Sequence, residues 1–141
     1  MTADPTCVFC KIVAGQIPSL AVQDDADTLA FLDINPLAEG HLLVIPKAHY
    51  AHIDEMPPAA VAAVTAHLPR LARAVMAATG AEGYNILQNN GAVAGQAVGH
   101  VHFHIIPRTA ADGLGYRWNV GQYPAGRDAA VHEQIVAALT H

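Results

Sequence analysis

The sequence contains few charged residues, and basic residues are especially scarce. Only 13% of its 141 residues are charged, and seven lysines and arginines stand against twelve acidic residues, for a formal net charge of −5. A protein that binds the backbone of a nucleic-acid polymer needs a basic stripe, so we expect no nucleic-acid polymer as a partner. A small anionic ligand fits this composition, because backbone amides, helix N-termini and protonated histidines can hold a single phosphate.

The sequence also lacks a long apolar run and has only two cysteines. No apolar run approaches the ~18–20 residues that span a membrane, and residues 1–5 lack the basic start and apolar centre of a secretory signal. We therefore expect a cytoplasmic protein with no membrane partner, in which Cys7 and Cys10 are reduced. Their Cys-x-x-Cys spacing leaves three interpretations open: metal ligands, a redox pair, or thiols without a special role.

Composition and pattern predict one α+β domain over residues 1–141. Apolar residues make up 52% of the chain, as in a compact globular protein, and we find no repeat and no linker. Short turns between consecutive strands predict antiparallel pairing, in a sheet with helices on one face. The expected elements are a short helix or turn at 7–15, strands at 21–23, 28–33, 41–46, 83–89 and around the histidines at 100–104, an Ala-rich helix at 59–79 kinked near Pro69, an ordered loop at 113–118, and a final helix at 127–140.

Three histidines alternate with apolar residues at His100, His102 and His104. In a β-strand, successive side chains point to opposite faces, so the three imidazoles would share one face and the intervening apolar residues would face a core. Three interpretations compete. The rings could chelate a metal together, one ring could act as a nucleophile with helpers, or the face could be polar without chemistry.

The segment from His100 to Ile106 matches the His-φ-His-φ-His-φ-φ signature (φ, apolar) of the histidine-triad (HIT) superfamily of nucleotide hydrolases and transferases. Residues 7–13, 31–33 and 40–47 and the Gly95-Gln96 turn resemble its bacterial Hint-like branch, in the right order. The similarity covers a core of about residues 7–108, and 109–141 form a C-terminal segment. It implies a HIT-like fold, a five-stranded antiparallel sheet with two main helices, in a homodimer whose sheets join.

This resemblance implies that His102 is the nucleophile. It would attack the α-phosphorus of a purine nucleotide and form a nucleotidyl-histidine that water resolves, while the backbone carbonyl of His100 holds its other ring nitrogen as N–H. His104 would donate a hydrogen bond to an α-phosphate oxygen and stabilise charge in the transition state. Gln96 and the turn at Gly95 would face the phosphate.

The resemblance also implies which residues bind the nucleotide. Asp33, at a strand end, would accept hydrogen bonds from both ribose hydroxyls. The side chains that would flank the base are Ile12, Ile17 and Phe31. The residues that would line the α-phosphate site or orient the triad are His41 and Asn89. The chain departs from the family pattern at Ala97, where a Ser or Thr hydroxyl usually contacts the phosphate or the leaving group, so this chain lacks the hydroxyl that would assist the leaving group.

A structural zinc site is the further implication. Related proteins complete the Cys-x-x-Cys pair with two histidines, at positions that correspond to His49 and His100. The expected zinc ligands are therefore Cys7, Cys10, His49 and His100, and His52 is the competing histidine. A closed four-ligand site of this type is structural and would tie the N-terminus to the sheet.

The leading functional hypothesis is a purine-nucleotide phosphoramidase, which hydrolyses AMP or GMP joined through a P–N bond to an amine, with adenosine phosphoramidates as the leading substrates. An Fhit-like hydrolase of dinucleoside polyphosphates is the nearest enzymatic alternative. A non-catalytic zinc- or nucleotide-binding module is the alternative from another class, given nine histidines and the missing hydroxyl at Ala97.

Overall fold

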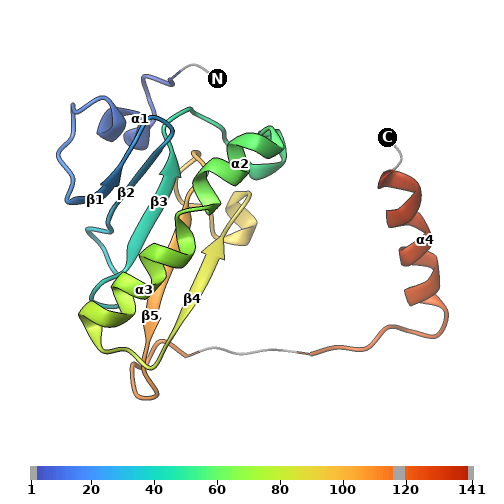
Figure 1. The fold of residues 1–141 in the computed structure, drawn as a ribbon. Helices are drawn as coiled ribbons and strands as arrows, with labels where there is room; N and C mark the ends of the chain where they lie inside the picture. Colours follow the sequence, from blue (N-terminus) through green and yellow to red (C-terminus); the bar gives the residue numbers. More distant parts are fainter. Residues whose placement is uncertain (1–2, 116–119, 140–141) are drawn as a thin grey trace.

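The structure is a computed structural model that describes residues 3–115 and 120–139. One antiparallel sheet has five strands in the order β1-β2-β3-β5-β4 (Figure 1). The strands are β1 (Ala21–Asp24), β2 (Thr28–Leu32), β3 (Leu42–Pro46), β4 (Gly83–Gln88) and β5 (Phe103–Arg108). This confirms the predicted five-stranded antiparallel sheet.

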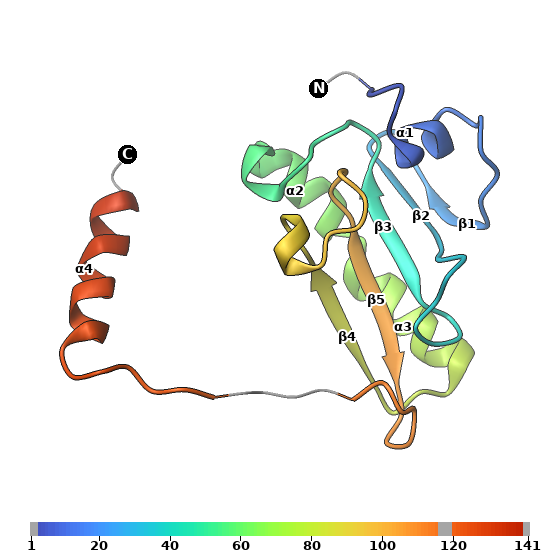
Figure 2. The same ribbon diagram turned by 180° about the vertical axis from the view of Figure 1, so that it is seen from behind.

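Helices cover both faces of the sheet, where the sequence predicted one (Figures 1 and 2). The helices are α1 (Val8–Val13), α2 (Pro58–Thr65), α3 (Leu68–Thr79) and α4 (Arg127–Leu139), with 3₁₀ turns η1 (Ile53–Glu55) and η2 (Ala92–Ala94). Helices α2 and α3 pack on one face, as expected, and α1 packs on the opposite face with its own core cluster. Helix α4 has no buried residue and stands apart from the sheet.

The single kinked helix predicted for 59–79 is two helices. Helix α2 ends at Thr65, and α3 begins at Leu68 with Pro69 in its first turn. A proline has no N–H to donate to the carbonyl four residues earlier, and its ring clashes with that carbonyl. Here the helix is interrupted at Ala66 and His67 and a new helix begins, with the proline at a favourable position in its first turn.

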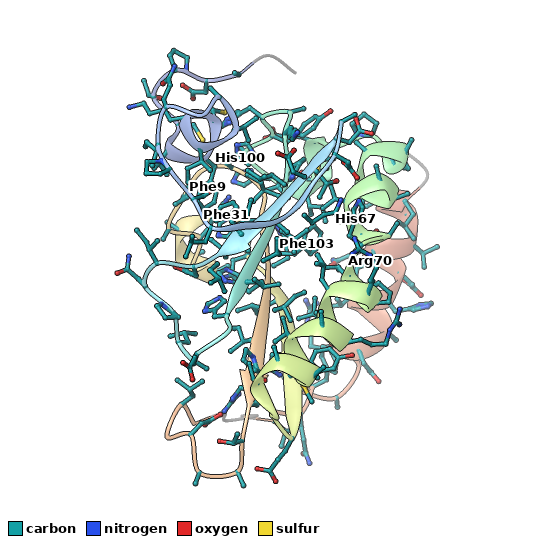
Figure 3. All side chains as sticks on the ribbon, turned by 60° about the vertical axis from the view of Figure 1, so that its left-hand side comes forward. Phe9, Phe31, His67, Arg70, His100 and Phe103 are labelled. Atoms are coloured by element: carbon teal, nitrogen blue, oxygen red, sulfur yellow. The ribbon has the colours of Figure 1, made fainter. Side chains whose placement is uncertain are left out.

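Strand β3 has both of its faces buried and separates the two core clusters. Leu42 and Val44 belong to the cluster beneath α2 and α3, and Leu43 and Ile45 belong to the cluster beneath α1. Figure 3 shows the second cluster from the side, with Phe9, Phe31 and His100 gathered next to α1. The candidate site is built on this α1 face.

The histidine segment is a strand only in its second half. Strand β5 begins at Phe103, so His104 lies within it, whereas His100 ends a bend and His102 lies in the short connection between that bend and the strand. The register pairs Val44 of β3 with Phe103, which would put Pro46 opposite Val101. Because proline has no N–H, the ladder stops there, and the Val101 N–H donates instead to the Tyr50 carbonyl, 2.8 Å away.

Two expectations extend beyond the described residues. Residues 116–118 of the loop predicted at 113–118, and Thr140 at the end of the last predicted helix, lie outside them. Within 3–115 and 120–139, no helix is long and apolar enough to cross a membrane.

Candidate active site and metal cluster

Strand register places three residues in one row across the sheet. Phe31 of β2 pairs with Leu43 of β3, and Leu43 pairs with His104 of β5. Directly paired residues point to the same face, so the row runs from an aromatic ring at one end to an imidazole at the other. Leu43 forms an apolar floor between them.

A pocket of about 460 Å³ opens above this row, between the sheet and α1. That volume is within the range typical of small-molecule sites. The predicted site residues that line it are Ile12, Ile17, Phe31, Asp33, Ala97, His102 and His104. The structure therefore brings together the residues expected to bind base, ribose and phosphate, from three stretches of the chain, 12–17, 31–33 and 97–104.

His102 is held in one orientation at the wall of this pocket. Its Nδ1 atom lies 2.7 Å from the backbone carbonyl oxygen of His100, so Nδ1–H donates and Nε2 is left with a lone pair. The ring is 5% exposed, and Phe9 meets it edge-on with ring centroids 5.1 Å apart. Burial lowers the pKa of His102, against the opposing effect of the His100 carbonyl. The ring is therefore a neutral imidazole with a free basic nitrogen at neutral pH.

His104 adjoins His102 and has a second histidine behind it. The ring centroids of His102 and His104 are 4.9 Å apart. The Nδ1 atom of His104 lies 2.9 Å from Nε2 of His41, which is 2% exposed. Burial, with smaller contributions from the two neighbouring histidines, lowers the pKa of His104 to about 4. His41 thus contacts the triad from the interior and is not among the residues that line the pocket.

Three residues expected near the phosphate, Asn89, Gly95 and Gln96, make hydrogen bonds within the protein. The Gln96 side chain accepts a hydrogen bond from the Gly91 N–H and donates one to the Ala51 carbonyl, each 2.7 Å long, and its own N–H donates to the Gly91 carbonyl. Asn89 donates to the Gly95 carbonyl at 3.4 Å. None of the three lines the pocket. Gln96 and Asn89 brace the loop that leads to the histidines. The expected contact of Gln96 with phosphate stays a prediction.

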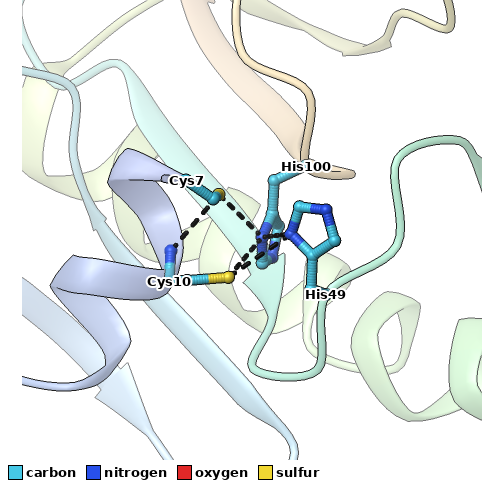
Figure 4. A group of neighbouring side chains, drawn as sticks. All are labelled: Cys7, Cys10, His49 and His100. Carbon is cyan, nitrogen blue, oxygen red and sulfur yellow. Dashed lines mark hydrogen bonds between the residues drawn. The ribbon is translucent and has the colours of Figure 1, made fainter. Parts of the chain in front are cut away.

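The four expected metal ligands converge at the end of α1 (Figure 4). The Nδ1 atom of His100 lies 3.4 Å from Sγ of Cys7, 3.6 Å from Sγ of Cys10 and 3.1 Å from Nδ1 of His49. Sγ of Cys10 lies 3.3 Å from Nδ1 of His49. In a tetrahedral site with bonds of about 2.0–2.3 Å, ligand atoms are about 3.3–3.8 Å apart, so the separations are close to those required.

The protonation pattern of the cluster also suits a cation. The Nε2 atom of His100 lies 2.8 Å from the Pro46 carbonyl, so Nε2 carries the proton and Nδ1 turns a lone pair toward the thiols. Backbone N–H groups of Cys10 and Asp4 donate to Sγ of Cys7 and Cys10 respectively, each at 3.4 Å. These residues form a possible Cys/His metal site. The alternative ligand His52 is half exposed and lies beside Glu55 instead.

The sequence interpretation missed Phe9. This residue is 6% exposed and lies edge-on to Phe31, His100 and His102, so it connects the pocket wall, the Cys/His cluster and the candidate nucleophile. Its position inside the Cys-x-x-Cys motif was the available signal. A residue between two ligands must lie near the third ligand, His100, and hence near His102. Val8, Ile34 and Asn35 of the pocket lining were also missed.

Known proteins resemble this chain over most of its length. A relative from Schizosaccharomyces pombe, named adenosine 5'-monophosphoramidase, is 50% identical over 114 residues, 80% of this chain and 83% of its own length. A relative from Arabidopsis thaliana, named adenylylsulfatase, is 48% identical over 113 residues, 80% of this chain. The chain spans only 57% of the length of that second relative.

Solved structures match over nearly the whole chain. A protein from Streptococcus mutans superimposes with a TM-score of 0.92 and 44% identity, covering 99% of this chain and 89% of that one. A zinc-bound histidine triad family protein from Mycobacterium smegmatis superimposes with a TM-score of 0.73 and 39% identity, covering 94% of this chain and 97% of that one. The family model described as HIT domain matches residues 14–111. The chain therefore belongs to the HIT domain family.

Proposed function

We propose that this protein is a nucleotide hydrolase that acts at the α-phosphate of purine nucleotides through a nucleotidyl-histidine intermediate, with adenosine phosphoramidates as its leading substrates. The observation that carries the proposal is the 2.7 Å contact between His102 Nδ1 and the His100 carbonyl. That contact fixes the tautomer with a basic Nε2 at the pocket wall. A nucleophile of this kind needs no separate strong base, because imidazole is largely unprotonated at neutral pH.

The reaction has two steps at one phosphorus atom. His102 Nε2 forms a bond to the α-phosphorus while the bond to the leaving group breaks, and the leaving amine takes up a proton from solvent. Water then attacks the phosphorus and breaks the P–N bond to His102, which releases AMP, neutral histidine and one proton to solvent. His104 donates a hydrogen bond to an α-phosphate oxygen in both steps. Asp33 accepts from the ribose hydroxyls, and Phe31, Ile12 and Ile17 contact the base.

The names of two relatives support a leaving group attached to AMP, an amine in one case and sulfate in the other. A pocket of about 460 Å³ suits one nucleotide, which favours these substrates over dinucleoside polyphosphates. The test compares turnover of an adenosine phosphoramidate with that of diadenosine triphosphate. His102→Ala should abolish both activities, and His132→Ala on α4 is the matched control. Faster turnover of diadenosine triphosphate would favour the Fhit-like alternative, and no turnover of either would favour the binding module.

We also propose that the Cys/His cluster binds structural zinc. Support comes from the near-tetrahedral spacing, the unprotonated Nδ1 of His100 and the zinc-bound Mycobacterium smegmatis neighbour. Because zinc binds thiolates, the site requires a reducing compartment such as the cytoplasm. Metal analysis of purified protein should give one zinc per chain, lost in Cys10→Ser and kept in His52→Ala. Stoichiometric zinc in Cys10→Ser would contradict the ligand set.

The homodimer belongs to the same proposal. Strand β4 is a sheet edge with exposed apolar side chains at Tyr84, Ile86 and Leu87, and such an edge favours pairing with another strand. Joining two β4 strands would produce one continuous sheet. Light scattering should report a dimer for the wild type and a monomer for Ile86→Lys. Leu20→Lys, beside the opposite edge strand β1, is the matched control and should remain dimeric.

A further inference from the structure

The loop that precedes β3 is folded around the buried His41. The His41 carbonyl accepts from the Asp33 N–H, its N–H donates to the Ala38 carbonyl, and its ring Nδ1 accepts from the Leu37 N–H, at 3.0, 3.0 and 3.1 Å. Gly40 lies so close to α3 that a Cβ there would be 2.6 Å from Cγ2 of Thr79, at a φ of +95°. The His41 ring is therefore fixed by backbone contacts on several sides.

These contacts determine where the ring protons lie. A backbone N–H can only donate, so Nδ1 of His41 must accept and its single proton must be on Nε2. The atom within hydrogen-bond distance of Nε2 is Nδ1 of His104, at 2.9 Å, because the Asp33 carboxylate is farther away at 3.7 Å. Nδ1 of His104 then accepts in turn, which leaves the His104 proton on Nε2.

We propose that the 34–40 loop, acting through the Leu37 N–H and His41, sets the tautomer of His104 so that its Nε2–H is available to the phosphate. His41 and the Leu37 amide are thus positioning groups that lie outside the reacting atoms. This relay, the chain of hydrogen bonds from the Leu37 N–H through His41 to His104, has only one direction, because its first donor is a backbone N–H that cannot accept a hydrogen bond. Burial lowers the pKa of both His41 and His104, which keeps each ring at one proton and preserves a single order of donors and acceptors.

The same order of donors and acceptors disfavours a metal ion between Asp33, His41 and His104, although their ligand atoms lie within 4.8 Å of one another. A metal at this position would need the lone pair of His41 Nε2, and that nitrogen carries the proton. The loop also contributes Ile34 and Asn35 to the pocket. A nucleotide that contacts these residues therefore touches the segment that orders the catalytic proton.

The relay is tested by NMR on the full-length protein, purified with its metal and labelled with ¹⁵N in histidine. We expect the proton to be bonded to His41 Nε2, with a through-hydrogen-bond ¹⁵N–¹⁵N coupling to Nδ1 of His104. Leu37→Pro removes the initiating N–H and also fixes φ at this position, and it should abolish or average that coupling, whereas Leu37→Ala, the matched control, keeps the backbone donor and should preserve it. The proton of His104 should be on Nε2 in the wild type.

A second pair of variants keeps the test decisive if Leu37→Pro fails to fold. His41→Leu removes the donor to His104 and should lower kcat at least tenfold with little change in KM. His41→Gln places an amide that can accept from Leu37 and donate to His104, so it should recover most of the rate. A proton bonded to His104 Nδ1 in the wild type, or equal rates in His41→Leu and His41→Gln, would overturn the relay. The assignment of the protons by NMR requires no turnover, so it tests the relay independently of the proposed reaction. Only the role of His104 toward the phosphate rests on the proposed function.

Discussion

The backbone carbonyl of His100 accepts a hydrogen bond from Nδ1 of His102 at 2.7 Å, while the ring of His100 belongs to the Cys/His cluster. One residue therefore connects the cluster to the candidate nucleophile. Phe9 makes the same connection from α1, with its ring against both histidines. A change in the cluster should therefore alter the position of the His102 ring, although His102 is not one of the proposed metal ligands.

Metal removal should consequently reduce both stability and activity. Cys10→Ser removes one of the four proposed metal ligands, and we expect its melting temperature to fall by more than ~5 °C. A loss of about 1 kcal/mol in the free energy of unfolding corresponds to roughly 4 °C for a domain of this size. Turnover should fall with it, because the His100 carbonyl loses its fixed position. Thermal melts and rates of Cys10→Ser beside His52→Ala check this. Unchanged activity in a metal-free Cys10→Ser protein would show that the Cys/His cluster does not influence His102 and would contradict this prediction.

Asp33 should contribute to substrate binding more than to the chemical step. Its Oδ1 accepts from the Asn35 N–H at 2.9 Å, and it lies at the pocket wall. Loss of a charged hydrogen-bond acceptor costs about 1.5–3 kcal/mol, so Asp33→Asn should raise KM roughly 10- to 100-fold with a smaller change in kcat. A 2',3'-dideoxy substrate should show the same weakened binding with the wild type and little further loss with Asp33→Asn. If the losses from the dideoxy substrate and from Asp33→Asn add up, the ribose hydroxyls do not bind to Asp33.

The rate should depend on pH through the protonation of His102. Protonation removes the Nε2 lone pair, and burial places the pKa of His102 below its ordinary value of 6.5. The rate of adduct formation should therefore be flat above about pH 6.5 and fall as pH drops through that lowered pKa. His104, with a pKa of about 4, should not add a step in this range. Single-turnover rates between about pH 5 and 8.5 test this, and a midpoint at or above 6.5 would contradict it.

His104 should act on the transition state and hardly on substrate affinity. Loss of one such hydrogen-bond donor typically costs about 10²–10³ in kcat, and we expect His104→Ala to fall in that range with KM nearly unchanged. His104→Gln retains an amide N–H and should recover part of the rate. Steady-state kinetics on an adenosine phosphoramidate measure both variants. A loss confined to KM would assign His104 to ground-state binding.

The sequence was sufficient to predict most of the fold because its signals are local. Apolar strands with short turns predicted the antiparallel pairing, and the helix predicted to end at residue 79 does end there, followed by Gly80 in the left-handed conformation. Pro69 predicted a disturbance of the helix, but the extent depends on the tertiary packing of α2 and α3, so a break was read as a kink. The side of the sheet taken by α1 depends on contacts with residues far along the chain.

The site was predictable where side-chain type limits the chemistry and less so where loops set the geometry. The four metal-ligand candidates and the pocket residues Phe31, Asp33, His102 and His104 come together as the motifs implied. Gln96 could not be placed from sequence, because its partners at Gly91 and Ala51 are fixed by loop conformation. The contact of Leu37 with His41 had no sequence signal, since the donor is a backbone amide that any residue except proline provides.

The most direct test of the central claim is the mass of protein denatured at alkaline pH after brief incubation with an adenosine phosphoramidate, because the P–N bond of a nucleotidyl-histidine hydrolyses in acid. The account predicts a gain of one AMP per chain, located by peptide mapping at His102, absent in His102→Ala and present in His132→Ala. Turnover with no adduct at any quench time, or an adduct that survives in His102→Ala, would contradict it.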